Sequence, residues 1–170
     1  MTETVTETRD AAPRPLPTVG ALIVAPDGRG LFVRTEKWRG LWGVPGGKIE
    51  GGETMLAALR RETREETGLT LHDVRWAPTQ EAVRSDAFAR DAHFVLLNFV
   101  ARTSATDVRL NDEADRHVWL RPADALRELP LNGPTRALVL HYLGHGHSGP
   151  VLREARTPSR ATTGSSRARP

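Results

Sequence analysis

The chain has 170 residues, enough for one domain with a hydrophobic core, and 38% of them are hydrophobic while 26% are charged. It contains no cysteine, which excludes a disulfide framework and a thiolate metal site. The formal net charge of +3 suits an anionic ligand, including a nucleic acid, although much of the positive excess lies near the C-terminus.

The two ends of the chain differ in composition from its middle. Residues 1–16 alternate Thr and Glu and then become rich in Ala and Pro, and residues 144–170 are basic and rich in Ser, Thr, Pro and Gly. Such segments bury too little apolar surface to offset the entropy lost on ordering, so we expect both to be disordered around one domain at 17–143. The chain lacks a membrane-length apolar run and an N-terminal signal peptide, and we expect a cytoplasmic protein with no membrane partner.

The first half of the domain begins with a predicted β-hairpin. The apolar run 19–24 is followed by the turn sequence Pro-Asp-Gly-Arg-Gly at 26–30 and by a second apolar run at 31–33. Residues 34–46 then form a loop rich in tryptophan, glycine and basic side chains.

A charged helix is predicted from about 54 to 67, ended by Gly68 in a left-handed conformation. Glu62, Glu65 and Glu66 are spaced three and four residues apart and therefore project from one side of the helix, where like charges repel. A cation between them would remove this cost, and carboxylate oxygens are ligands that Mg²⁺ and Mn²⁺ prefer. Arg61 can pair with one of these carboxylates through two hydrogen bonds. The alternative is a solvated charged surface.

The second half of the domain predicts further strands and two more helices. Residues 92–102 are apolar on both faces, which indicates a central strand. The other expected elements are a weak strand region at 74–83, a polar loop at 84–91, an acidic turn at 109–115, a short strand at 117–120, a helix opened by Pro122 and a last helix at 135–143.

The stretch from Gly47 to Leu69 resembles the Nudix box, G-x5-E-x7-R-E-U-x-E-E-x-G-U, in which U is a bulky aliphatic residue. The positions that match are Gly47, Glu53, Arg61, Glu62, Glu65, Glu66, Gly68 and Leu69. Thr63 departs from the pattern, because it stands where the family has an aliphatic residue. It shares a helix strip with Leu56 and Leu59, so we expect a buried side chain whose hydroxyl can bond the Leu59 carbonyl one turn earlier.

The resemblance covers residues 17–143 and implies the Nudix fold, an α/β/α sandwich with a mixed β-sheet between helices. It also implies Mg²⁺-dependent hydrolysis, with Mn²⁺ as a possible substitute, of a nucleoside diphosphate linked to another group. By this resemblance Glu62, Glu65 and Glu66 bind the metal, together with the Gly47 carbonyl and possibly Glu53, while Arg61 orients a carboxylate.

The general base stays open between a box glutamate and a carboxylate from a distant loop, for which Glu113 in the acidic turn is the candidate. Glu50 lies outside the fixed positions of the motif, and we expect it to be dispensable. Trp38 and Trp42 suggest a stacking wall for a base, although aromatic side chains in such a loop also cap a core edge. The basic candidates for phosphate binding are Arg34, Lys37, Arg39 and Lys48.

Within the family the sequence favours a small nucleotide substrate, either a (d)NTP or an NDP-sugar. Two alternatives remain open: a 5′-end RNA pyrophosphohydrolase that uses the basic tail as an anchor, and a non-catalytic module that senses a nucleotide. The complete set of charged box residues speaks against the second alternative, because a sensor need not retain a metal site.

Overall fold

A computed structural model of the chain describes residues 14–154, and the expectations for residues 1–13 and 155–170 lie outside this range. The strands are β1 (Leu16–Val24), β2 (Gly30–Thr35), β3 (Trp42–Gly43), β4 (Gly46–Lys48), β5 (His72–Trp76), β6 (Gln80–Val83), β7 (His93–Arg102) and β8 (Ala114–Leu120). The helices are α1 (Met55–Thr67), α2 (Pro122–Glu128) and α3 (Gly133–His145), with a single 3₁₀ turn, η1 (Glu36–Trp38). None of the described helices has the length and apolar character needed to cross a membrane.

The eight strands form one mixed sheet centred on β1 and β7, which run parallel to each other over the full length of β1. The other pairings are antiparallel: β2 and β4 pair with β1, β5 and β6 pair with β7, and β3 and β8 pair with β2. The expectation of a central strand at 92–102 is confirmed. The expected loop at 34–46 also contributes two short strands, β3 and the start of β4.

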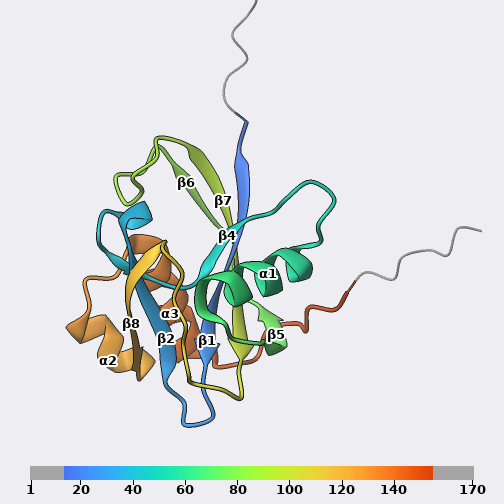
Figure 1. Cartoon of the computed structure of the whole chain (residues 1–170), viewed down its shortest axis with the longest axis vertical. Helices are drawn as coiled ribbons and strands as arrows, with labels where there is room; N and C mark the ends of the chain where they lie inside the picture. Colours follow the sequence, from blue (N-terminus) through green and yellow to red (C-terminus); the bar gives the residue numbers. More distant parts are fainter. Residues whose placement is uncertain (1–13, 155–170) are drawn as a thin grey trace, which may run out of the picture.

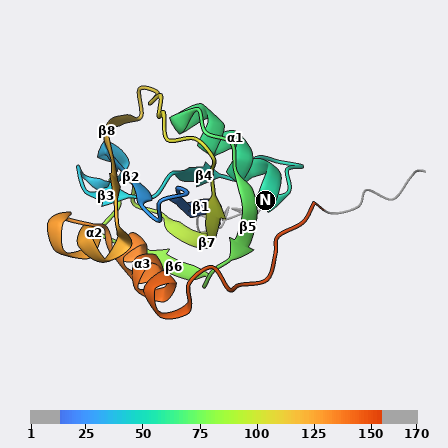
Figure 2. The same ribbon diagram turned by 90° about the horizontal axis from the view of Figure 1, so that it is seen from below.

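Helices cover both faces of this sheet, with α1 on one side and α2 and α3 on the other (Figure 1, Figure 2). Successive side chains of a strand point to opposite faces, so Ile23 of β1 and Phe99 of β7 pack in the α1 core, whereas Leu22 and Val100 pack in the core beneath α3. The expected α/β/α sandwich is confirmed.

The helix α1 is bounded by two caps that its sequence predicts. The Thr54 hydroxyl accepts a hydrogen bond from the backbone N–H of Ala57 at its start, and Gly68 ends the helix with φ of 73°. These caps fix which residues fall on the sheet-facing side, where Leu56 and Leu59 are buried. The charged box residues therefore face the end of the sheet formed by β4.

Thr63 is fully buried on this inner side, but the expected bond to the Leu59 carbonyl is wrong: its hydroxyl is buried without a hydrogen-bond partner among the described residues. A buried hydroxyl without a partner carries its full desolvation cost. We therefore predict that Thr63→Val stabilises the protein by about 1 kcal/mol, measured by urea unfolding.

The matched control is Thr67→Val, one turn further along the same buried strip. The Thr67 hydroxyl donates to the Thr63 carbonyl at 2.6 Å and accepts from the Leu69 N–H at 3.3 Å, so its removal is expected to destabilise the fold. A stability loss from Thr63→Val equal to that from Thr67→Val would contradict the assignment of an unpartnered hydroxyl.

The segment 147–152, assigned to the disordered tail from its composition, instead packs along the edge of β5. The Trp76 N–H donates to the Pro150 carbonyl at 2.9 Å, and the Leu152 N–H donates to the Val74 carbonyl at 2.8 Å. The Leu152 side chain packs against the α1 core, and His147 Nε2 lies 2.7 Å from the Asp73 carbonyl oxygen. The segment has too few apolar residues to be predicted as ordered from its own sequence. The strand on which it packs lies some 75 residues earlier in the chain.

We accordingly predict that a chain ending at Gly146 is less stable than one ending at Glu154, because the β5 edge loses these bonds and the Leu152 contact. The expected loss is about 1–3 kcal/mol, a drop in melting temperature of several degrees by calorimetry. A chain ending at Glu154 is expected to have the same melting temperature as the full-length protein. Equal melting temperatures for the chains ending at 146 and 154 would show that the segment adds nothing to the fold.

Candidate active site

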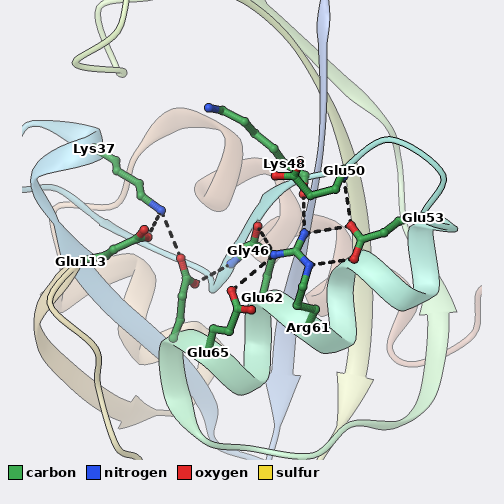
Figure 3. A network of polar contacts seen from close by, with 10 residues as sticks. Lys37, Gly46, Lys48, Glu50, Glu53, Arg61, Glu62, Glu65 and Glu113 are labelled. Carbon is green, nitrogen blue, oxygen red and sulfur yellow. Dashed lines mark hydrogen bonds and ion pairs between the residues drawn. The ribbon is translucent and has the colours of Figure 1, made fainter.

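The guanidinium of Arg61 is the centre of the polar network on α1 (Figure 3). Its Nε and Nη2 donate to the two oxygens of Glu53 at 2.7 and 2.9 Å, while Nη1 lies 3.0 Å from Glu62 and 3.4 Å from Glu65. Nη2 also donates to the Lys48 carbonyl at 3.1 Å. The two-bond pairing expected of Arg61 therefore falls on Glu53, and the contact with Arg61 lowers the pKa of Glu53 to about 2.

This pairing gives Glu53 a different contact from the one suggested by the resemblance. Both of its oxygens bind Arg61, and one also accepts the Glu50 N–H at 3.0 Å. Glu53 therefore holds Arg61 against the β4 backbone in this structure, and its role as a metal ligand stays a prediction.

A second network holds Glu66, the most buried carboxylate of the box. One oxygen accepts the Gly46 N–H at 2.9 Å, and the other lies 3.2 Å from Lys37 Nζ. Burial raises the pKa of Glu66 to about 7, against the opposing pull of Lys37. Lys37 also pairs with Glu113, and this contact lowers the pKa of Glu113 (Figure 3). Glu113, which follows Glu66 by 47 positions in the sequence, is thus brought beside the box.

The backbone of β4 lies against these carboxylates at both glycines. A Cβ added at Gly47 would lie 2.4–2.5 Å from the Glu62 carboxylate, and one added at Gly46 would lie 2.1 Å from the Val19 carbonyl oxygen. Gly46 also has φ of 155°. The glycine pair is therefore needed for close approach of β4 to β1 on one side and to α1 on the other.

A cavity with a volume of about 580 Å³ opens beside these networks. Its charged and polar lining includes Lys37, Lys48, Glu50, Arg61, Glu62, Glu65, Arg90, Asn98, Glu113 and Thr135. Its aromatic and aliphatic lining includes Trp38, Val44, Phe88, Phe94 and Leu96. A cavity with one charged set and one aromatic set of walls suits a ligand that has an anionic part and a planar apolar part.

The predicted substrate-binding residues divide into two groups. Trp38 and Lys48 line the cavity. Arg34 is instead paired with Asp115 of β8, Arg39 donates to the Phe88 carbonyl at 3.4 Å, and Trp42 packs into the core beneath α3. None of the three lines the cavity, because β2 and β3 turn Arg34 and Trp42 toward other elements, and Arg39, at the end of η1, bonds the β6–β7 loop. Glu50, expected to be dispensable, does line it.

The donor set of the box fits a hard divalent cation, since Glu62, Glu65 and Glu66 offer carboxylate oxygens within one helix turn of each other. In the described part of the chain, however, no three Asp, Glu or His side chains are disposed to hold an ion as they stand. These carboxylates instead form ion pairs with Arg61 and Lys37. Both cations thus neutralise the charge that an ion would otherwise neutralise.

Sequence reasoning missed the roles of Phe88, Asn98 and Lys37 in this site. The sequence predicts only a phosphate contact for Lys37, and it predicts a polar loop around Phe88. No local signal marks Asn98, whose amide donates to the Pro78 carbonyl at 2.9 Å from inside β7. Each is brought to the cavity by contacts between segments distant in sequence.

The sequence of this chain is similar to a known domain family and to characterised proteins. Residues 14–142 match the NUDIX domain. The chain is 33% identical to the nucleoside triphosphatase NudI of Escherichia coli over 116 residues, which cover 65% of this chain and 77% of that protein.

Solved structures agree with the fold. The crystal structure of a MutT NUDIX hydrolase from Burkholderia pseudomallei is similar, with a TM-score of 0.63 and 30% identity over 75% of this chain and 98% of that one. A NUDIX hydrolase from Nitrosomonas europaea gives a TM-score of 0.66 with 23% identity over 84% and 98% of the two chains, a likeness of fold. The chain belongs to the Nudix family and is a hydrolase that acts on phosphoanhydride bonds.

Proposed function

We propose that the protein hydrolyses nucleoside triphosphates in the cavity beside α1, with water attacking phosphorus. One observation carries the proposal: the box carboxylates of Glu62 and Glu65, the basic side chains of Lys48 and Arg90, and the aromatic side chains of Trp38 and Phe88 line the same 580 Å³ cavity. The likeness to a nucleoside triphosphatase favours a triphosphate over an NDP-sugar.

In this proposal different residues bind the polyphosphate, position the carboxylates and accept a proton. Lys48 and Arg90 attract the polyphosphate, and Arg61 holds Glu62 and Glu65 in place through the contacts at 3.0 and 3.4 Å. The oxygen of water bonds to phosphorus, and the bond from that phosphorus to the leaving phosphate oxygen breaks with its electron pair. Glu113 accepts the proton of the water, because its pairing with Lys37 keeps it ionised at neutral pH.

Glu62, Glu65 and Glu66 are the residues that would hold Mg²⁺ or Mn²⁺, with the backbone of Gly47 beside them. A bound divalent cation supplies charge neutralisation at the phosphate oxygens and a lower pKa for the attacking water. The pairs that Glu66 and Glu62 make with Lys37 and Arg61 keep these carboxylates in place before an ion is bound.

We predict that turnover requires a divalent cation. Protein treated with a chelator is expected to lose hydrolysis of its best triphosphate and to regain it with Mg²⁺ or Mn²⁺, and titration with Mn²⁺ followed by electron paramagnetic resonance should show binding that Glu66→Gln weakens. Full turnover by metal-free protein would refute the requirement.

The substrate class is tested by a hydrolysis screen with Mg²⁺ over ribo- and deoxynucleoside triphosphates, NDP-sugars, ADP-ribose, dinucleoside polyphosphates and 5′-triphosphorylated RNA. Free nucleoside triphosphates are expected to give the highest kcat/KM. Faster turnover of triphosphorylated RNA, lost when residues 155–170 are removed, would favour an RNA-directed enzyme instead.

A further inference from the structure

The loop between β6 and β7 lines the same cavity as the box and is hydrogen-bonded to η1 and to Arg39 at its end. The backbone N–H of Ala89 donates to the Lys37 carbonyl at 2.8 Å, and Arg39 Nε donates to the Phe88 carbonyl at 3.4 Å. Figure 1 shows this loop beside η1 at the upper end of the sheet. Two segments about 50 residues apart in the sequence therefore share one rim of the cavity.

These bonds bring Phe88 and Trp38 to the same cavity. The ring of Trp38 packs against Gly43, where the lack of a side chain leaves room for it: an added Cβ would lie 2.1 Å from the ring. Phe88 packs on Phe94 of β7, with ring centroids 4.7 Å apart and an angle of 34° between the planes. Both aromatic side chains are half-buried, so each is fixed by packing on one side and open to the cavity on the other.

We propose that Phe88, together with Trp38, is the base-stacking element of the substrate site, an inference that rests on the proposed function. Each of the four nucleobases has a flat π-face, and stacking on an aromatic ring does not read its hydrogen-bonding edge. Phe88 therefore contributes affinity for the nucleoside part of the substrate and accepts all four bases.

The same loop is tied to the charged end of the site through a single residue. The carbonyl of Lys37 holds Ala89, while its ammonium group pairs with Glu66 and Glu113. Phe88 touches neither carboxylate network in the described contacts, so its loss is expected to act on binding of the base and to leave the chemistry of the polyphosphate unchanged.

The test compares Phe88→Ala and Phe88→Trp with the control Asp86→Ala, a change of an exposed side chain in the same loop that does not line the cavity. The probes are ATP, GTP, CTP, UTP, their α,β-methylene analogues and inorganic tripolyphosphate. Phe88→Ala is expected to raise KM for all four nucleotides about tenfold with kcat changed less than about threefold, within the range known for loss of one stacked base. Phe88→Trp should retain wild-type KM, and Asp86→Ala should match the wild type.

Inhibition by tripolyphosphate separates stacking from a general effect on the fold, since tripolyphosphate has no base. Its inhibition constant should be the same for wild type and Phe88→Ala. An unchanged KM in Phe88→Ala, or an equal weakening of tripolyphosphate and nucleotides, would overturn the inference. If no triphosphate is hydrolysed, the proposed function fails, and calorimetric binding of the analogues decides: weaker binding to Phe88→Ala upholds the stacking role, and equal binding refutes it.

Discussion

Glu62→Gln and Glu66→Gln are each expected to lower kcat by about 10²- to 10³-fold, the loss typical of removing one preorganised electrostatic group from an active site. Glutamine keeps the shape of the side chain and its helix propensity but removes a negative charge from the proposed metal site. The interactions lost act on charge that develops in the transition state, so KM should change much less than kcat. Steady-state kinetics with a saturating divalent cation measures both.

Folding should survive these changes, which keeps the kinetic result interpretable. The Glu66 side chain is buried and has a pKa raised to about 7, so a neutral amide is tolerated there, and its carbonyl oxygen can still accept the Gly46 N–H. Glu128→Gln is the control, because Glu128 is an exposed carboxylate of α2 on the opposite layer of the sandwich. Glu50 is unsuitable as a control, since it lines the cavity. Wild-type rates in both box variants would mean that α1 presents only a solvated charged face.

Gly47→Ala is expected to lower kcat by about 10²-fold while leaving the melting temperature close to that of the wild type, since displacement of a catalytic group by about 1 Å costs that much. The added methyl group would lie 2.4–2.5 Å from the Glu62 carboxylate and must push it away from its contact with Arg61. Gly47 is not among the residues with positive φ, so the backbone accepts alanine without strain. Kinetics and calorimetry on the same sample make the comparison.

The matched control for this change is Gly51→Ala, four residues further along. A Cβ at Gly51 meets no atom within 4 Å, and its backbone is likewise outside the positive-φ region. Gly51→Ala should therefore keep wild-type kcat. Equal kcat for Gly47→Ala and wild type would show that the position of the Glu62 carboxylate does not limit turnover.

Much of the fold follows from local patterns in the chain. The caps at Thr54 and Gly68, with the spacing of Leu56 and Leu59, are enough to place α1 and to predict its buried face. The apolar run at 92–102 predicts a central strand because both of its faces require cover. The box residues could be located for the same reason: they lie on one helix and its preceding loop, where spacing in sequence is nearly spacing in space.

The contacts that the sequence could not reveal join segments far apart. The pairing of Lys37 with Glu113 and the bond from Ala89 to the Lys37 carbonyl depend on how β2, β7 and β8 are arranged in the sheet. The segment 147–152 is polar enough to resemble a tail, yet its backbone completes the edge of β5. Trp42 and Arg34 show the reverse case, in which a suitable side chain near the box is turned elsewhere by its strand.

Hydrolysis of a nucleoside triphosphate in ¹⁸O-labelled water, with mass spectrometry of both products, tests the central claim most directly. One ¹⁸O atom is expected in a phosphate group of one product, only in the presence of a divalent cation, and labelling should fall with kcat in Glu66→Gln. Labelling that persists at the wild-type rate in metal-free protein or in Glu66→Gln, or no turnover of any triphosphate, would contradict hydrolysis at phosphorus by the carboxylates of α1.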